Sequence, residues 1–214
     1  CGNGGRGIVE FAADLGYTSF DFEAPDGPHS AELLSGEAGP FSHEARIVRL
    51  KMKDVSSAAA YDNGPDREPD LFLDTGTRHA VRFVDNVNDI DVVGEGRVLR
   101  YSPDFAPVGA NVNFVQVNAD GSITVRTYEK GVEDETLACG TGIVASAMAT
   151  WIAHKRHEQG KIVSIPVHAR ISDLSVSFRP SDVACESSAP ASFSASDVYL
   201  TGPAVFVGKV ITDL

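Results

Sequence analysis

Residues 128–157 read YEKGVEDETLACGTGIVASAMATWIAHKRH, and this stretch decides how the rest of the chain can fold. From Ile143 onward, apolar side chains recur at intervals of three and four residues, which predicts a helix with one buried stripe. The stripe consists of Ile143, Val144, Ala147, Met148, Trp151 and Ile152. Thr141 is the predicted N-cap, and residues 155–157 place basic side chains in the last turn. The sequence therefore predicts a long helix with Cys139 at its N-terminal end.

A cysteine in front of a helix lies among backbone N–H groups that have no carbonyl partner within the helix. These groups and the helix dipole lower the pKa of a thiol from about 8.5 toward neutrality, which makes a thiolate available. Gly140 and Gly142 also let the backbone close around a carboxylate or phosphate. We therefore expect Cys139 to have a lowered pKa and to face an anion site.

Residues 1–16, CGNGGRGIVEFAADLG, repeat this arrangement with a cysteine, a Gly-x-Gly turn and a helix. The predicted apolar face of this helix consists of Ile8, Phe11, Ala12 and Leu15. Cys1-Gly2-Asn3-Gly4 thus matches Cys139-Gly140-Thr141-Gly142. Two copies of so unusual an arrangement predict two halves that face one site, each supplying a thiol at a helix N-terminus.

Five motifs in this chain resemble those of the diaminopimelate epimerases, which belong to the cofactor-independent, two-cysteine racemase superfamily. The motifs are CGNGGR (1–6), DTGTRH (74–79), NVNFVQ (111–116), YEKGVEDETLACGTG (128–142) and LTGPAVFV (200–207). They occur in the family's order over nearly all of the chain, and the motif at 128–142 is the most specific. The resemblance implies an α+β fold of two similar halves. Each half is a sheet wrapped around a central helix, and the active site lies in the cleft between them.

The remaining sequence reads as short strands joined by turns, which with two helices favours an α+β fold. Residues 45–53 alternate apolar and basic side chains, as half-exposed strands do. Asp120-Gly121 is the strongest hairpin signal, and it lies between strands expected at 111–117 and 122–128. Further strands are expected at 71–73, 79–85, 162–171, 174–178, 198–200 and 205–211, with loops at 61–69 and 181–196. The acidic segment 85–96 is predicted to connect the halves, so the expected domains are 1–90 and 91–197, with terminal strands at 198–214 returning to the first half.

The composition of the chain argues against several classes of protein. The 214 residues are 43% apolar, enough to bury a substantial core. A formal net charge of −12 argues against nucleic acid or an anionic membrane as a partner, and no apolar run is long enough to span a bilayer. The three cysteines are far apart, so neither a zinc site nor a disulfide framework is predicted. Free thiols predict a reducing, cytoplasmic location.

Inverting a carbon next to a carboxylate needs a base on one face and an acid on the other, and two cysteines can fill these roles. We assign them to Cys1 and Cys139, which exchange roles with the direction of reaction. N–H groups at the two helix N-termini would hold the negative charge that develops on the substrate. No cofactor and no metal ion are therefore expected.

The resemblance implies the remaining roles residue by residue. The substrate-binding residues are Gly2, Asn3, Asn111, Glu129, Lys130, Gly140 and Thr141, with His79 and Thr77 in support. The implied partner is a small amino acid, diaminopimelate. The implied reaction converts its LL isomer to the meso isomer in the biosynthesis of lysine and cell-wall precursors.

The chain departs from the family pattern at several positions. Lys130 stands where many members have Arg, so a point charge replaces a bidentate fork for carboxylate. Thr77-Arg78 replaces the commoner Asn-Pro or Ser-Pro before His79. Members of the family carry strands and substrate-binding asparagines before the first cysteine. The N-terminal half is therefore expected to be truncated, with the chain being the C-terminal portion of a longer protein or a processed form.

Other interpretations remain open at this stage. The chain could be a racemase of proline or hydroxyproline, or a truncated fragment that binds without catalysis. Gly2-x-Gly4-x-x-Gly7 also matches a dinucleotide-binding fingerprint, but that motif requires a preceding strand in a βαβ unit. Cys185 lacks any comparable context and is interpreted as structural or incidental. The sequence also leaves open whether the chain forms a homodimer.

Overall fold

The computed structural model describes residues 2–24, 27–35, 41–62, 68–154, 161–181 and 193–208. Within these ranges the chain forms one strongly curved sheet of twelve strands and three α-helices. The helices are α1 (Gly2–Asp14), α2 (Val92–Arg100) and α3 (Gly140–His154), with short 3-10 turns η1 (Val87–Asp89) and η2 (Pro103–Phe105). The strands are β1 (Phe20–Ala24), β2 (Gly27–Ser35), β3 (Arg46–Lys51), β4 (Ala58–Tyr61), β5 (Asp70–Asp74), β6 (Arg78–Phe83), β7 (Asn111–Val117), β8 (Ile123–Glu129), β9 (Asp134–Thr136), β10 (Val163–His168), β11 (Asp173–Pro180) and β12 (Ala195–Ala204).

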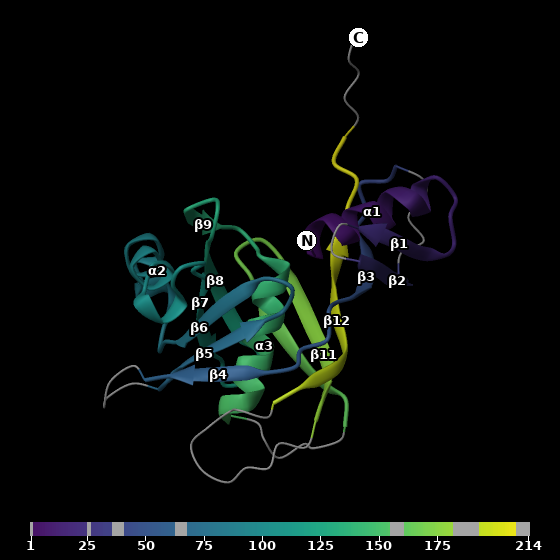
Figure 1. Ribbon diagram of the computed structural model, residues 1–214. Coiled ribbons are helices and arrows are strands. Elements are labelled where there is room, and N and C mark those ends of the chain that lie inside the picture. Colours follow the sequence, from purple (N-terminus) through teal and green to yellow (C-terminus); the bar gives the residue numbers. More distant parts are fainter. Residues whose placement is uncertain are drawn as a thin grey trace.

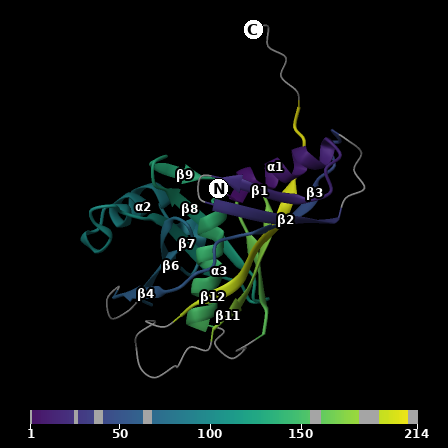
Figure 2. The same cartoon turned by 45° about the vertical axis from the view of Figure 1, so that its right-hand side comes forward.

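The sheet joins two sheet-and-helix parts through its longest strand. Its order is β1-β2-β3-β12-β11-β10-β8-β7-β6-β5-β4, with β9 paired to β8. β12 pairs with β3 on one side and with β11 on the other, and Figures 1 and 2 show it running between α1 and α3. The α+β class and the two-part architecture expected from the sequence are confirmed.

α3 is the central helix of the larger part and is buried on all sides. The predicted helix is confirmed, but its single buried stripe is wrong, since every residue from 142 to 152 is buried. The faces outside the stripe carry small residues, which let the strands approach closely. Their hydroxyl groups find partners inside the helix: Ser146 donates to the Gly142 carbonyl, and Thr150 donates to that of Ser146.

α1 buries the face opposite to the predicted one. Ile8, Phe11 and Leu15 are each more than half exposed, at 53%, 56% and 55%. The buried side instead carries Glu10 and Asp14, whose carboxylates each accept a 2.8 Å hydrogen bond from Arg46 of β3. Apolar periodicity alone could not predict this orientation, because an ion-pair cluster packs α1 against β3.

Most of the expected strands are present. The alternation in β3 and the hairpin of β7 and β8 are confirmed, and Gly121 in the hairpin turn has a φ of 85°. A strand at 205–211 is wrong for residues 205–208, since β12 continues through Gly202 and Pro203 and ends at Ala204; residues 209–211 lie outside the described residues. Most of the loop expected at 181–196 also lies outside them, and its last two residues begin β12.

The segment 85–96 is not a plain connection, because it forms η1 and the first turns of α2. Asp91 caps α2 by accepting a hydrogen bond from the Gly94 N–H at 3.0 Å. Gly94 and Gly96 obscured this helix in the sequence, since glycine has a low helix propensity. The domain division at residue 90 stays a prediction, and the sheet is continuous across it because β6 pairs in parallel with β7.

Candidate active site

The N-termini of α1 and α3 meet, which brings the two repeated motifs together. A Cβ atom on Gly140 would lie 3.0 Å from the Cα of Gly2, and a Cβ on Gly2 would lie 3.3 Å from the Cα of Gly140. Only glycine at both positions allows so close an approach. Cys1 lies outside the described residues, and Cys139 directly precedes α3.

A pocket of about 750 Å³ opens beside this junction and draws on both parts of the sheet. It brings together the described residues that the sequence predicted to bind or transform the substrate, together with one of the two supporting residues. These are Gly2, Asn3, Thr77, Asn111, Glu129, Lys130, Cys139, Gly140 and Thr141. His79, the second supporting residue, does not line the pocket and is fully buried behind it. Lys53, Asp74 and Arg78 add charged groups to the lining that the sequence did not single out.

Cys139, not Thr141, is the N-cap of α3, because the Cys139 carbonyl accepts the hydrogen bond of the Ile143 N–H at 2.8 Å. Thr141 lies in the first turn, and its hydroxyl is 3.5 Å from the Cys139 Sγ. The predicted N-cap was wrong because the helix begins two residues earlier than a Thr141 cap implies, at Gly140.

Burial raises the pKa of the Cys139 thiol, so the lowered pKa expected from the sequence is wrong. Cys139 is only 9% exposed, and the cost of removing a thiolate from water exceeds the stabilisation that the helix N-terminus provides. Hydrogen bonds from the Thr141 hydroxyl and the Gly142 N–H act in the opposite direction, while the Glu129 carboxylate raises the pKa further. Cys139 is therefore a protonated thiol at neutral pH, suited to act first as an acid.

His79 is connected to the pocket by hydrogen bonds to two hydroxyl groups, those of Thr77 and Thr141. Its Nε2 lies 2.8 Å from the Thr77 Oγ1 and 2.9 Å from the Thr141 Oγ1. Burial lowers the pKa of His79 from 6.5 to about 3, with the Asp74 carboxylate acting weakly in the opposite direction. His79 is consequently neutral at neutral pH and brings no positive charge to Cys139.

Asn113 is a site residue that the sequence reasoning missed. Its Nδ2 lies 3.1 Å from the His79 Nδ1, and its side chain is fully buried. The available signal was the NVN triplet, because residues at i and i+2 of a strand share one face. Asn111 lines the pocket, and Asn113 lies on the same face behind it.

Asn3 links α1 to the segment that leads into Cys139. Its Nδ2 donates to the Ala138 carbonyl at 3.0 Å, and its Oδ1 accepts from the Arg6 guanidinium at 3.0 Å. The Asn3 amide thus fixes the relative position of the two helix ends as well as lining the pocket.

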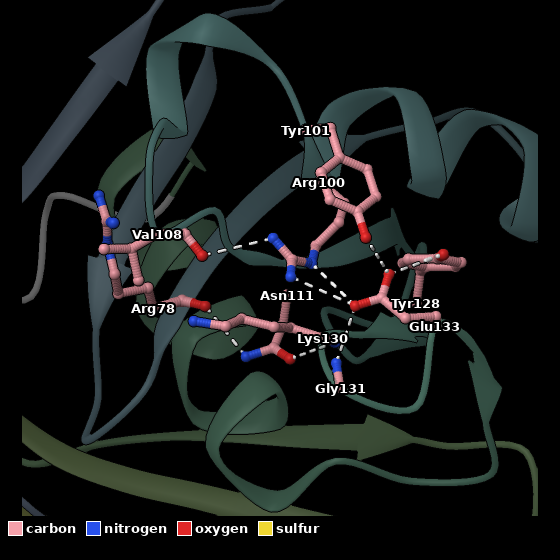
Figure 3. A network of polar contacts seen from close by, with 9 residues as sticks. All are labelled: Arg78, Arg100, Tyr101, Val108, Asn111, Tyr128, Lys130, Gly131 and Glu133. Carbon is pink, nitrogen blue, oxygen red and sulfur yellow. Dashed lines mark hydrogen bonds and ion pairs between the residues drawn. The ribbon is translucent and has the colours of Figure 1, made fainter.

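The turn after β8 carries Lys130, which lines the pocket and lies beside the Asn111 side chain (Figure 3). The Asn111 side chain holds the base of this turn, since its Oδ1 accepts from the Lys130 N–H at 2.8 Å and its Nδ2 donates to the Arg78 carbonyl at 3.0 Å. Glu129 is oriented by Thr136, whose hydroxyl donates to it at 2.8 Å. Asn111 therefore positions the turn through contacts with two backbone groups.

Glu133 closes the same turn and has a φ of 59°, in the left-handed region. Its carboxylate accepts hydrogen bonds from the Gly131 N–H at 3.0 Å, the Tyr101 hydroxyl at 3.1 Å and the Tyr128 hydroxyl at 3.2 Å. It also accepts from Arg100 at 3.2 Å. We call Glu133 and these four partners the Glu133 cluster; it fixes the turn that presents Lys130.

Comparisons with known proteins place the chain in a family. The Diaminopimelate epimerase family model matches residues 71–176. A diaminopimelate epimerase from Flavobacterium psychrophilum is 36% identical over 97% of this chain and 70% of its own length. Another from Chlorobaculum tepidum is 35% identical over 95% of this chain and 71% of its own length.

The chain belongs to the diaminopimelate epimerase family. Membership of this family makes it an isomerase. Among solved structures, a probable proline racemase from Agrobacterium radiobacter K84 matches with a TM-score of 0.64 at 17% identity, over 97% of this chain and 66% of that one. A PhzF-family phenazine biosynthesis protein from Bacillus anthracis also matches with a TM-score of 0.64, at 15% identity, over 97% and 74%. These two likenesses show the fold.

Arg78, one of the departures noted in the sequence, is the first residue of β6 and follows the β5–β6 turn. Its guanidinium lies 5.1 Å from the centre of the Phe72 ring and donates to the Phe105 carbonyl at 3.4 Å. These contacts anchor the end of the β5–β6 turn.

Neither a metal centre nor a membrane span is found in the described part of the chain. No three or more His, Cys, Asp or Glu side chains there gather as a metal ion would require. None of the described helices is long and apolar enough to cross a bilayer.

Proposed function

We propose that this chain converts LL-2,6-diaminopimelate to the meso isomer by a cofactor-independent, two-thiol mechanism. The observation that carries the proposal is the contact of Gly2 with Gly140 in the lining of a pocket that also contains Cys139. Because Cys1 directly precedes Gly2 in the chain, this contact favours a pair of thiols on either side of one substrate carbon.

In one direction, Cys1 as thiolate removes the proton from the substrate's α-carbon, and the Cys139 thiol delivers a proton to the opposite face. One C–H bond breaks as the S–H bond of Cys1 forms, while the S–H bond of Cys139 breaks as the new C–H bond forms. In the reverse direction the two cysteines exchange roles. The raised pKa of Cys139 supports its role as the acid in the first direction.

The substrate carboxylate next to the reacting carbon is proposed to bind at the two helix N-termini. The first turn of α3 offers the N–H groups of Gly140, Thr141 and Gly142, and α1 offers its own first turn on the other side. Donors placed where charge develops are each worth about 3–4 kcal/mol of transition-state stabilisation. This electrostatic term takes the place of an organic electron sink.

The distal end of diaminopimelate carries a second carboxylate and a second ammonium group. We assign the distal carboxylate to Lys130, and an ammonium group of the substrate to Glu129; both side chains line the pocket. A proline racemase would have no use for a cation that binds a distal carboxylate, because proline has a single carboxylate. Lys130 in the pocket lining therefore supports diaminopimelate as the substrate.

We place the reaction in the biosynthesis of lysine and of cell-wall precursors. We also infer a cytoplasmic location, because the mechanism needs two thiols that stay reduced.

The test is exchange of the α-hydrogen in D₂O with LL-diaminopimelate, under reducing conditions and without added cofactor. Deuterium at the inverted centre should appear with the unchanged chain and be lost in Cys1→Ala and in Cys139→Ala. Cys185→Ala removes a thiol without the helix context and should retain exchange. Exchange that persists in Cys139→Ala, or that occurs with proline in place of diaminopimelate, would contradict the proposal.

A further inference from the structure

A buried chain of polar side chains runs from the sheet to Cys139. It begins at Asn113, whose Nδ2 donates to the Ala80 carbonyl at 3.1 Å and whose Oδ1 accepts from the Thr127 hydroxyl at 3.0 Å. A carbonyl oxygen can only accept, so the contact with Ala80 decides which end of the amide is the nitrogen. The orientation of the Asn113 amide is therefore fixed by its backbone contact.

This orientation determines where the proton of His79 lies. The second N–H of the Asn113 amide points at the His79 Nδ1 over 3.1 Å, so that ring nitrogen must accept. A neutral imidazole carries one proton, which then belongs to Nε2. His79 is accordingly held as the Nε2–H tautomer.

The Nε2–H meets two hydroxyl groups, those of Thr77 and Thr141, which are 3.0 Å apart. Because the ring N–H is the donor and the hydroxyl oxygens accept, neither hydroxyl donates its own proton to the ring. The proton of Thr141 is then available to the Cys139 Sγ at 3.5 Å. The donors thus run in one direction, from Asn113 to Cys139.

We propose that Asn113 is a positioning residue of the epimerase site: by fixing His79 as the Nε2–H tautomer, it directs the Thr141 hydroxyl proton at Cys139 and stabilises the thiolate that Cys139 forms during the reaction. The inference rests on the function proposed above and adds to it how the sulfur's change of charge is supported. In the opposite tautomer, Nε2 would accept, Thr141 would turn its proton toward the ring, and Cys139 would lose a donor.

A second observation ties this chain of donors to the first turn of α3. A Cβ atom on Gly142 would collide with the Asn113 Oδ1 and lie 3.2 Å from the His79 Cε1. The helix that carries Cys139 therefore rests directly on the Asn113–His79 pair, and glycine at 142 leaves room for it.

The test compares Asn113→Asp and Asn113→Leu with the unchanged chain. The Asp carboxylate keeps the shape of the amide but can only accept a hydrogen bond from an Nδ1–H, which moves the His79 proton from Nε2 to Nδ1. The Leu side chain removes the donor without adding charge, so both tautomers should be populated. Asn118→Asp makes the same chemical change at the turn of the same hairpin and serves as the matched control.

Three measurements test the inference on each variant. Nitrogen-15 NMR of the histidine ring, assigned with His79→Gln, reports the tautomer. The rate of Cys139 alkylation against pH, followed by mass spectrometry of its peptide, reports the thiol. Exchange kinetics give kcat and KM. Glu129 and Asp74, the charged groups that act on Cys139 and His79, stay unchanged throughout.

We expect the proton on Nε2 in the unchanged chain and in Asn118→Asp, and on Nδ1 in Asn113→Asp. Alkylation of Cys139 at neutral pH should slow about tenfold in Asn113→Asp and less in Asn113→Leu, with kcat falling and KM nearly constant.

A proton on Nδ1 in the unchanged chain would overturn the inference even if neither variant folds. A slower alkylation in the Asp variant alone would assign the effect to charge and overturn it as well. If diaminopimelate shows no exchange, the proposed function fails, while the NMR and alkylation results still decide the direction of the donors.

Discussion

Gly2 and Gly140 meet without room for a side chain between them, and Leu200 of β12 fills the space beside both. Its Cδ2 would lie 2.9 Å from a Cβ on Gly2 and 3.1 Å from one on Gly140. The two helix N-termini are thus held together by a contact that any larger residue would push apart.

Gly140→Ala should therefore separate the helix ends and reduce kcat/KM at least tenfold. The added methyl group presses on the backbone of Gly2, which cannot rotate away as a side chain can, and overpacking of this kind costs about 1–3 kcal/mol. Exchange kinetics and urea denaturation measure the two effects.

Gly7→Ala is the matched control, because a Cβ on Gly7 meets nothing within 4 Å. It should leave activity unchanged and stabilise α1 by about 0.5–1 kcal/mol, since alanine favours helix over glycine. Equal activity in Gly140→Ala and Gly7→Ala would show that the close approach is not required.

His79 should make the chain sensitive to acid. Its folded pKa of about 3 lies below the unfolded value of 6.5, so the unfolded chain binds the proton first. Stability is fully present above about pH 6.5 and is lost as pH falls toward 3, by about 1.4 kcal/mol at pH 5.5 relative to neutral pH.

Urea denaturation near pH 7.5 and pH 5.5 checks this expectation for the unchanged chain and for His79→Gln. The Gln variant has no group titrating at this position and should lose about 1.4 kcal/mol less stability between the two pH values. The same loss in both proteins would assign the acid sensitivity to other groups.

Cys139 should be a slow nucleophile at neutral pH, because burial raises the pKa of its thiol. Its alkylation rate is expected to keep rising well beyond about pH 8.5, where ordinary thiols titrate. The folded pKa lies above the unfolded one, so this thiol's contribution to stability is present below the unfolded pKa and declines as pH rises through the folded pKa. Rapid modification of Cys139 near pH 7 would contradict the raised pKa.

The Glu133 cluster should govern binding of the distal end of the substrate. Glu133→Gln weakens the hydrogen bonds that hold the turn carrying Lys130, so KM for diaminopimelate should rise several-fold while kcat changes little. The loss of charge-assisted hydrogen bonds at this partly exposed side chain should cost about 1–2 kcal/mol of stability.

Glu135→Gln offers a comparison on the neighbouring strand. Glu135 of β9 pairs with Arg126 at 2.7 Å and lies outside the turn that carries Lys130. It should lower stability without raising KM, and a similar rise in KM for both variants would mean that the turn is not specifically responsible.

The parts of the fold that could be predicted from sequence depend on local patterns. The apolar spacing after Ile143 located α3, and Asp120-Gly121 located the β7–β8 hairpin, because neighbouring residues decide helical period and turn type. The orientation of α1 could not be predicted in this way. It depends on Arg46, which lies 36 and 32 positions from Glu10 and Asp14 along the chain.

The site shows the same division. The repeated cysteine motif indicated which helix ends would meet, and the structure brings Gly2 and Gly140 together. The predicted direction of the Cys139 pKa shift was wrong. The sequence indicates the helix N-terminus that lowers a thiol pKa, but it does not indicate the burial that outweighs this effect. Asn113 escaped notice because its partner His79 lies on a different strand, and only the parallel pairing of β6 with β7 brings them together.

The two helices that meet at the site differ in how deeply they are held, since α3 is enclosed by the sheet while α1 leaves Ile8, Phe11 and Leu15 more than half exposed. Amide protons of α1 should therefore exchange with solvent through small local openings, long before those of α3, which need the whole domain to open. The α3 side of the candidate active site should therefore resist local unfolding, whereas the α1 side should unfold at a small free-energy cost. On warming, epimerase activity should be lost at a lower temperature than the far-UV circular dichroism signal, because local unfolding of α1 disrupts the site while most of the chain stays folded.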